Sequence, residues 1–285
     1  ETPSLKDRRP SGIGMATPDG HAFYFDIWEP SLPWEILWNK KIRKLFHNAP
    51  FDLAKETLGL YNVDLDSIDD SIIVTRLLPD IGNSLVEASF WVETQAWDMQ
   101  ALMNDYNAKT TLELPWAMLA EKCCRDAMAC MEVFKKFKPK VSQEYYEVER
   151  RFLVKLLKMS YKGIRLDTER VWAIDRELEA QLLYIMSKLR NIGVNPLSPR
   201  EVAITLLKRG HYLPQDRITG HPSTQDSILE TLNDPLAKLI ILGRKYSKLH
   251  GTYIHKWRAL DRFFTHYYCD TATGRVSSRN QNGQN

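Results

Sequence analysis

Residues 270–278 read Asp-Thr-Ala-Thr-Gly-Arg-Val-Ser-Ser, a run of small and hydroxyl-bearing residues around one glycine and one arginine. Gly274 permits close approach of another backbone because it has no side chain. Arg275 can reach the acceptor atoms that every base pair presents in the minor groove. Serines and the later Asn282 and Asn285 supply neutral hydrogen bonds of the kind made to sugar and phosphate. The residue types suit a nucleic-acid groove, and a polar β-turn is the alternative.

Residues 243–253, which read Gly-Arg-Lys-Tyr-Ser-Lys-Leu-His-Gly-Thr-Tyr, precede this stretch. They lie within a predicted long helix, which begins at Asp234-Pro235, a capping residue followed by proline, and continues to about residue 260. Arg244 and Lys248 are four residues apart and therefore lie on one face of that helix. Basic side chains on one face suit contacts with phosphate, and a solvated basic face is the alternative.

Charge is distributed unevenly along the 285 residues, although the net charge is only +3. Residues 1–140 carry 16 basic and 21 acidic side chains, whereas residues 141–285 carry 23 and 15. The hydrophobic fraction of 44% excludes a disordered, collagen-like or coiled-coil chain. An acidic half before a basic half indicates two domains with different partners, nucleic acid being a candidate for the second. Chance drift in surface charge is the alternative.

Targeting signals are not evident in the sequence. No apolar run approaches the roughly 18 residues that a membrane span needs, and no leader-like segment opens the chain. The four cysteines form no Cys-x-x-Cys pair and are too few for a disulfide framework. We therefore expect a reducing, cytoplasmic location (the host cytoplasm if the source is viral), no membrane partner and a monomer.

The motifs in the second half of the chain resemble those of family A, DNA polymerase I-like enzymes. Residues 270–278 resemble the Thr-x-Thr-Gly-Arg-Leu-Ser-Ser segment of that family, and residues 282–285 resemble the Asn-Leu-Gln-Asn that follows it. Residues 161–167, 219–224 and 243–253 resemble thumb segments in the same order. The resemblance implies that primer–template DNA is the partner. It also implies these DNA-binding positions: Arg244, Lys248, Thr252, Thr273, Gly274, Arg275, Ser277, Asn282 and Asn285.

The first half carries two carboxylates in settings where burial is costly. Asp52 follows an apolar strand-like segment, and Asp126 lies in a helix flanked by cysteines and alanines. Buried carboxylates usually need a cationic partner. Converging carboxylates can hold two divalent ions that clamp a phosphodiester. From these residues alone, the alternative of a helix cap at Asp52 and an ion pair at Asp126 is favoured.

Their order and spacing resemble the motifs of the 3′–5′ proofreading exonuclease domain of the same polymerases. Glu1, in Glu1-Thr2, resembles the Glu of the first motif, with the preceding Asp cut off. The resemblance implies that Glu1, Asp52 and Asp126 hold two Mg²⁺ or Mn²⁺ ions and act in catalysis. It also implies that Asn48 and Phe51 contact a single-stranded 3′ end.

Lys122 is the one serious departure from that pattern. It stands four residues before Asp126, where the family places a Tyr that orients the attacking water. Its catalytic role is therefore doubtful, and we expect proofreading to be weakened or lost in this chain.

The expected fold follows from these resemblances. Residues 1–140 are expected to form an α/β, ribonuclease H-like exonuclease domain, a mixed sheet with flanking helices and a truncated first strand. Residues 141–285 are expected to form a mainly helical thumb and the β start of the palm. The catalytic palm residues would lie downstream, so the chain would be a fragment that does not polymerise DNA alone. The alternatives are a stand-alone exonuclease of the same superfamily and a catalytically silent DNA-binding module. A processivity partner cannot be named.

Overall fold

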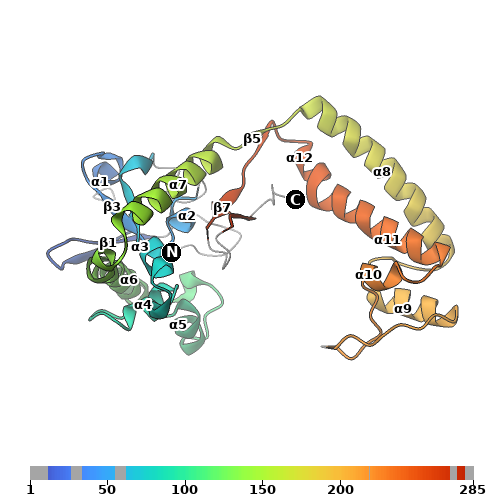
Figure 1. The fold of residues 1–285 in the computed structure, drawn as a ribbon, viewed down its shortest axis with the longest axis horizontal. Coiled ribbons are helices and arrows are strands. Elements are labelled where there is room, and N and C mark those ends of the chain that lie inside the picture. Colours follow the sequence, from blue (N-terminus) through green and yellow to red (C-terminus); the bar gives the residue numbers. More distant parts are fainter. Residues whose placement is uncertain (1–11, 27–33, 55–61, 218, 270–274, 280–285) are drawn as a thin grey trace. The chain divides into compact units, whose positions relative to one another are not determined.

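The computed structural model describes residues 12–26, 34–54, 62–217, 219–269 and 275–279, and Figure 1 shows their fold. The chain divides into two compact units. Unit 1 comprises the described residues within 1–163 and 264–285, and unit 2 comprises those within 164–263. Both units are mainly helical.

Unit 1 contains, in chain order, β1 (Gly12–Ala16), β2 (Ala22–Asp26), α1 (Trp34–Trp38), β3 (Lys44–Phe46), α2 (Ala49–Asp52), β4 (Ile68–Asp70), α3 (Ser71–Leu77), α4 (Leu85–Ser89), α5 (Met99–Asp105), α6 (Trp116–Phe137), α7 (Gln143–Lys162), β7 (His266–Tyr268) and β8 (Ser277–Arg279). Unit 2 contains β5 (Ile164–Arg165), α8 (Thr168–Asn191), α9 (Pro199–Lys208), α10 (Asp226–Leu229), α11 (Pro235–Lys248), a π-helical segment (Leu249–Ile254), α12 (His255–Trp257) and β6 (Arg262–Phe263).

The strands of the described residues pair two by two and do not form the large mixed sheet that the sequence predicts. In unit 1, β1 pairs with β2 antiparallel and β3 pairs with β4 parallel. Helix α6 packs against β1, β2 and β3, so a helix, not strand hydrogen bonding, connects the two pairs. Gly14 permits this packing, because a Cβ there would lie 2.5 Å from the carbonyl oxygen of Cys123. The truncated first strand predicted at Glu1 lies outside the described residues.

The division between the units falls at residues 163 and 164, not at the predicted boundary of 140 and 141. Helix α7 causes the difference, because its apolar face is part of the core of unit 1. Tyr146, Leu153 and Leu157 of α7 are buried with Leu53 and Val133 in one hydrophobic cluster. Unit 2 has a separate core between α8, α9 and α11, built from residues such as Leu189, Leu206 and Ile240.

The helix start predicted at Asp234-Pro235 is confirmed, because the side chain of Asp234 caps α11. Ser84 forms a capping box with Glu87 at the start of α4, and Asp167 caps α8 through its side chain. Helix α3 begins at Ser71, because Asp70 ends strand β4 and caps α3. No helix in the described part of the chain is long and apolar enough to cross a membrane.

Candidate functional site

Helix α6 presents Lys122, Asp126 and Cys130 at four-residue intervals, which places them along one helical face. The Lys122 Nζ lies 2.5 Å from Asp126 Oδ2. The side chain of Lys122 is only 6% exposed and that of Asp126 is 27% exposed. The lysine that replaces the expected tyrosine therefore neutralises the carboxylate that was expected to hold metal.

The predicted carboxylates Asp52 and Asp126 both contribute to the electrostatic environment of the Cys130 thiol. Burial raises the pKa of Cys130 to about 12, with further contributions from the negative charges of Asp70, Asp52 and Asp126. All three carboxylates therefore act on one buried sulfur. That Asp52 and Asp126 belong to one catalytic site stays a prediction.

Asp70 is the residue of this cluster that sequence reasoning missed. Its side chain is fully buried and accepts hydrogen bonds from the backbone N–H groups of Asn48 (2.9 Å), Ala49 (2.7 Å) and Ile72 (3.0 Å). Burial raises its pKa to about 6. The sequence feature that could have identified Asp70 is its position directly before Ser71, at the start of a helix, where Asp is a preferred capping residue. Asp70 fixes the starts of α2 and α3, and thereby positions Asn48 and Asp52.

Of the two residues predicted to contact the 3′ end of a DNA strand, Asn48 directly precedes α2 and Phe51 lies within it. Asn48 has a positive φ of 72° and lines a small cavity with Arg76, Glu149 and Cys269. Phe51 is 44% exposed. An exposed aromatic ring is compatible with base stacking. Contact with a 3′ end stays a prediction for both residues.

The expected pair of divalent ions does not fit this arrangement. A metal ion at Asp126 would compete with an ammonium group that is buried against the same carboxylate. Like charges repel strongly where water is excluded. Glu1, the third expected ligand, lies outside the described residues. We therefore derive no metal-dependent step at this site.

In unit 2, Arg244 has a different role from the phosphate contact predicted for it. Its guanidinium donates hydrogen bonds to Pro196 O (2.7 Å), Thr224 O (2.5 Å) and Asp226 Oδ1 (2.8 Å), and its side chain is 17% exposed. Because its donors are largely taken by protein acceptors, Arg244 ties α11 to two loops. A phosphate contact would require these bonds to break.

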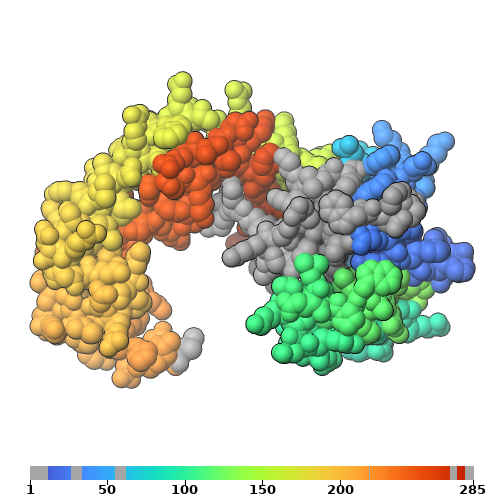
Figure 2. All heavy atoms as spheres, turned by 180° about the vertical axis from the view of Figure 1, so that it is seen from behind, coloured from blue at the N-terminus to red at the C-terminus, as the bar shows by residue number. Residues whose placement is uncertain are grey.

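Lys248, four residues further along the same helix, is exposed, as is Thr252. Lys238 and Lys245 are exposed on α11 as well, and sequence reasoning missed both. The sequence could have indicated them, because spacings of seven residues from Lys238 to Lys245 and three from Lys245 to Lys248 place the three lysines on one face of the helix. Figure 2 shows α11 and the segment that follows it, in orange-red, on the surface of unit 2.

Of the predicted DNA-binding segment, residues 270–285, the structure describes residues 275–279, and these include strand β8. Ser277 pairs with Tyr268 in the β7–β8 ladder, and Arg275 is exposed just before it. The alternative of a β-turn is therefore wrong for residues 277–279. The remaining predicted DNA-binding residues lie outside the described residues: Thr273, Gly274, Asn282 and Asn285.

The sequence of the chain is similar to those of DNA polymerases. DNA polymerase I of Treponema pallidum is 27% identical over 271 residues, covering 87% of this chain and 27% of that protein. DNA polymerase DpoZ of Acinetobacter phage SH-Ab 15497 is 24% identical, covering 87% of this chain and 45% of DpoZ. A thermostable DNA polymerase I of Thermus thermophilus is 32% identical over 154 residues, which are 50% of this chain and 18% of that enzyme. No family model matches the chain.

The fold has a counterpart among solved structures. The POL domain of Pol1 from M. smegmatis, solved in complex with DNA primer-template and dNTP, has a TM-score of 0.64 and 17% identity. The match covers 96% of this chain and 49% of that one. The resemblance to family A DNA polymerases is therefore confirmed over most of the chain. The chain spans less than half of the length of each of these relatives.

Proposed function

We propose that this chain is the part of a DNA polymerase I-like protein that holds a primer–template duplex, and that its exonuclease-like unit 1 does not hydrolyse DNA. The complete protein would be a DNA-directed DNA polymerase, a nucleotidyltransferase of replication or repair. Within it, unit 2 corresponds to the thumb, and β7 and β8 correspond to the start of the palm.

The observation that carries the proposal is the similarity to DNA polymerases along nearly the whole chain, including both units. A relative that shared only an exonuclease domain would leave unit 2 without a counterpart. The stand-alone exonuclease is therefore the weaker alternative.

The chemistry of unit 2 supports duplex binding. Residues 164–263 carry 16 Lys and Arg side chains against 11 Asp and Glu side chains. Lys238, Lys245 and Lys248 lie exposed on α11 and can approach phosphates. Phosphate contacts provide affinity without sequence preference, which a polymerase requires.

The chemistry of unit 1 supports the loss of hydrolysis. Two-metal cleavage needs carboxylates free to bind cations that stabilise the attacking and leaving oxygens. Here the buried ammonium of Lys122 is already paired with Asp126. The two Mg²⁺ or Mn²⁺ ions implied by the resemblance are therefore not part of the proposal for this unit. The silent DNA-binding module was weighed as an alternative for the whole chain, and the proposal shares with it the absence of hydrolysis by unit 1.

The test is the binding of a fluorescent primer–template duplex, followed by anisotropy at increasing salt concentration. The wild-type chain should bind, and its logarithmic affinity should fall linearly with the logarithm of the salt concentration. The double variant Lys245→Ala/Lys248→Ala should bind more weakly, with a slope shallower by about 2.

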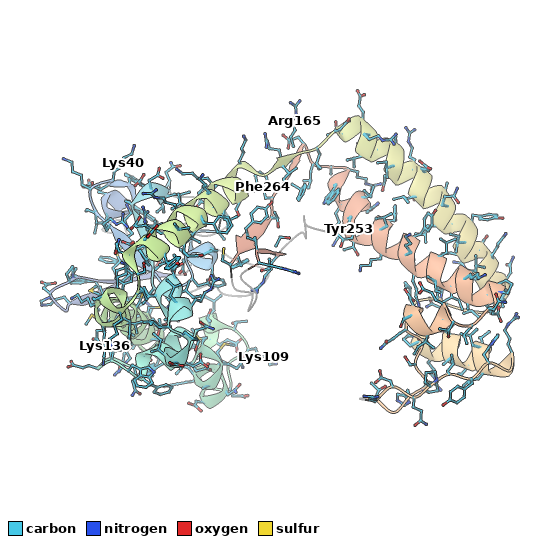
Figure 3. All side chains as sticks on the ribbon, viewed as in Figure 1. Lys40, Lys109, Lys136, Arg165, Tyr253 and Phe264 are labelled. Atoms are coloured by element: carbon cyan, nitrogen blue, oxygen red, sulfur yellow. The ribbon has the colours of Figure 1, made fainter. Side chains whose placement is uncertain are left out.

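Lys40→Ala/Lys41→Ala is the matched control, because both lysines are exposed in unit 1 and the double variant removes the same charge. Figure 3 labels Lys40. The control should bind the duplex as the wild type does. Absence of duplex binding, or equal slopes in all three proteins, would contradict the proposal.

A further inference from the structure

Asp175, His250 and His255 form a cluster in unit 2 that the proposed function does not use. Asp175 lies on α8, His250 lies in the π-helical segment, and His255 begins α12. Figure 1 shows α8 running beside the helix that α11 and α12 belong to. Figure 3 labels Tyr253, which belongs to the same π-helical segment as His250.

The π-helical segment explains why the two histidines meet. In an α-helix, residues five apart are separated by about 140° around the axis and point in different directions. Residues 249–254 instead follow a π-helix, whose wider turn closes over five residues and brings positions five apart near the same side. The rings of His250 and His255 have centroids 5.1 Å apart. Short π-helical stretches are rare and frequently occur at functional sites.

Two atoms at the centre of the cluster are buried and lack a hydrogen-bond partner among the described residues. These atoms are Asp175 Oδ1 and His250 Nε2. They lie 3.2 Å apart, and His255 Nδ1 lies 3.7 Å from the same carboxylate oxygen. The three atoms all lie within 4.8 Å of one another. Ligands placed about 2.0–2.1 Å from a tetrahedral zinc ion are separated by about 3.4 Å, so the distances from the two histidines to Asp175 Oδ1 are close to those of a zinc site.

We propose that unit 2 binds one zinc-class divalent ion through Asp175, His250 and His255. Two imidazole nitrogens and one carboxylate oxygen favour zinc, cobalt or nickel over magnesium or calcium, which prefer oxygen ligands. His255 is 44% exposed and provides access from solvent. Water can therefore fill the fourth position.

Arg258 completes the surroundings without occupying the site. Its Nη1 lies 3.5 Å from the other oxygen of Asp175, Oδ2, and its guanidinium stacks over Trp172. Hydrogen bonding to the outer oxygen of a ligating carboxylate orients that ligand. The ion would join α8 to the helix that contains residues 235–257, and thereby stiffen unit 2.

The test uses Co²⁺ as a spectroscopic probe, added to the full chain after treatment with a chelator. The wild type should develop the visible absorption of tetrahedral Co²⁺ up to one equivalent. Zn²⁺ should displace the Co²⁺ and raise the melting temperature, whereas Mg²⁺ should do neither. His255→Gln should lower the Co²⁺ affinity at least tenfold. Its partly exposed side chain makes this variant the one expected to fold normally, which circular dichroism checks.

His221→Gln is the matched control, because this histidine is exposed in the same unit. It should bind Co²⁺ as the wild type does. Absence of the absorption in the wild type would overturn the proposal. Binding that persists unchanged in His255→Gln would also overturn it, because the ligands would then lie elsewhere, for example at the cysteines of unit 1. Neither outcome depends on whether the chain binds DNA.

Discussion

The two units treat charged side chains in opposite ways. In unit 1, Lys122 is buried and paired with Asp126, and the charge of each is neutralised inside the protein. In unit 2, Lys245 and Lys248 are exposed on the surface of α11. The same residue type is thus paired with a carboxylate in unit 1 and exposed to solvent in unit 2. What decides the function of a lysine here is whether a protein acceptor already holds it, which the sequence alone does not reveal.

Arg244 and Lys248 show the same contrast within one helix, because protein acceptors bind Arg244 whereas Lys248 is exposed. Two single variants test whether the two side chains differ in their contribution to stability. Arg244→Ala removes hydrogen bonds to Pro196 and Thr224 and an ion pair to Asp226. We expect the free energy of unfolding to fall by about 3–4 kcal/mol, because charged hydrogen bonds are lost and buried acceptors remain. Lys248→Ala should change it by less than about 0.5 kcal/mol. Urea denaturation measures both, and equal effects would remove the distinction.

Buried ionisable groups should also give unit 1 an unusual dependence of stability on pH. Burial raises the pKa of Asp70 from 3.8 to about 6 and lowers the pKa of His47 from 6.5 to about 4. For Asp70, the folded state binds the proton more tightly, so the free energy of unfolding rises as the pH falls from about 6 to 4. For His47, the unfolded state binds the proton more tightly, so that free energy falls over nearly the same range. The two effects oppose each other.

Single variants should uncover each effect, with a size on the order of 3 kcal/mol across the range. Asp70→Asn should lose stability steeply when the pH falls from 6.5 to 4, because only the effect of His47 remains. His47→Gln should gain stability over the same range. Urea denaturation at a series of pH values measures the slopes. Parallel curves for the wild type and both variants would show that neither pKa is shifted.

The sequence allowed the helices and their starts to be predicted where the cause is local. Ser84, Asp167 and Asp234 cap helices through their own side chains, and each could be recognised from its neighbours. The boundary between the units could not, because the burial of α7 against Leu53 and Val133 depends on contacts distant in sequence. The boundary predicted between residues 140 and 141 is therefore displaced to residues 163 and 164.

In the candidate sites too, features with a local cause could be predicted from the sequence, and features that depend on distant contacts could not. The grouping of Asp52 and Asp126 in one site was inferred from the order of the motifs, and it stays a prediction. An ion pair at Asp126 was the alternative that the residues alone favoured, and the structure shows one. Its partner, Lys122, was not named in advance, although the four-residue spacing of the two on a helix permits the contact. The hydrogen bonds of Arg244 to Pro196 and Thr224 could not be predicted, because these acceptors lie in loops 20 to 48 residues away in sequence. Asp70 was missed because a buried cap looks like any polar residue before a helix.

The most direct test of the contrast uses one substrate for both units. A primer–template duplex labelled at the primer 3′ end is incubated with the chain and Mg²⁺, and binding and release of the label are followed in the same sample. Asp126→Asn provides the comparison. The account predicts that both proteins bind the duplex and that neither releases the label above background. Release by the wild type that requires Mg²⁺ and is absent in Asp126→Asn would show that Lys122 leaves the carboxylate site active, and would contradict the account.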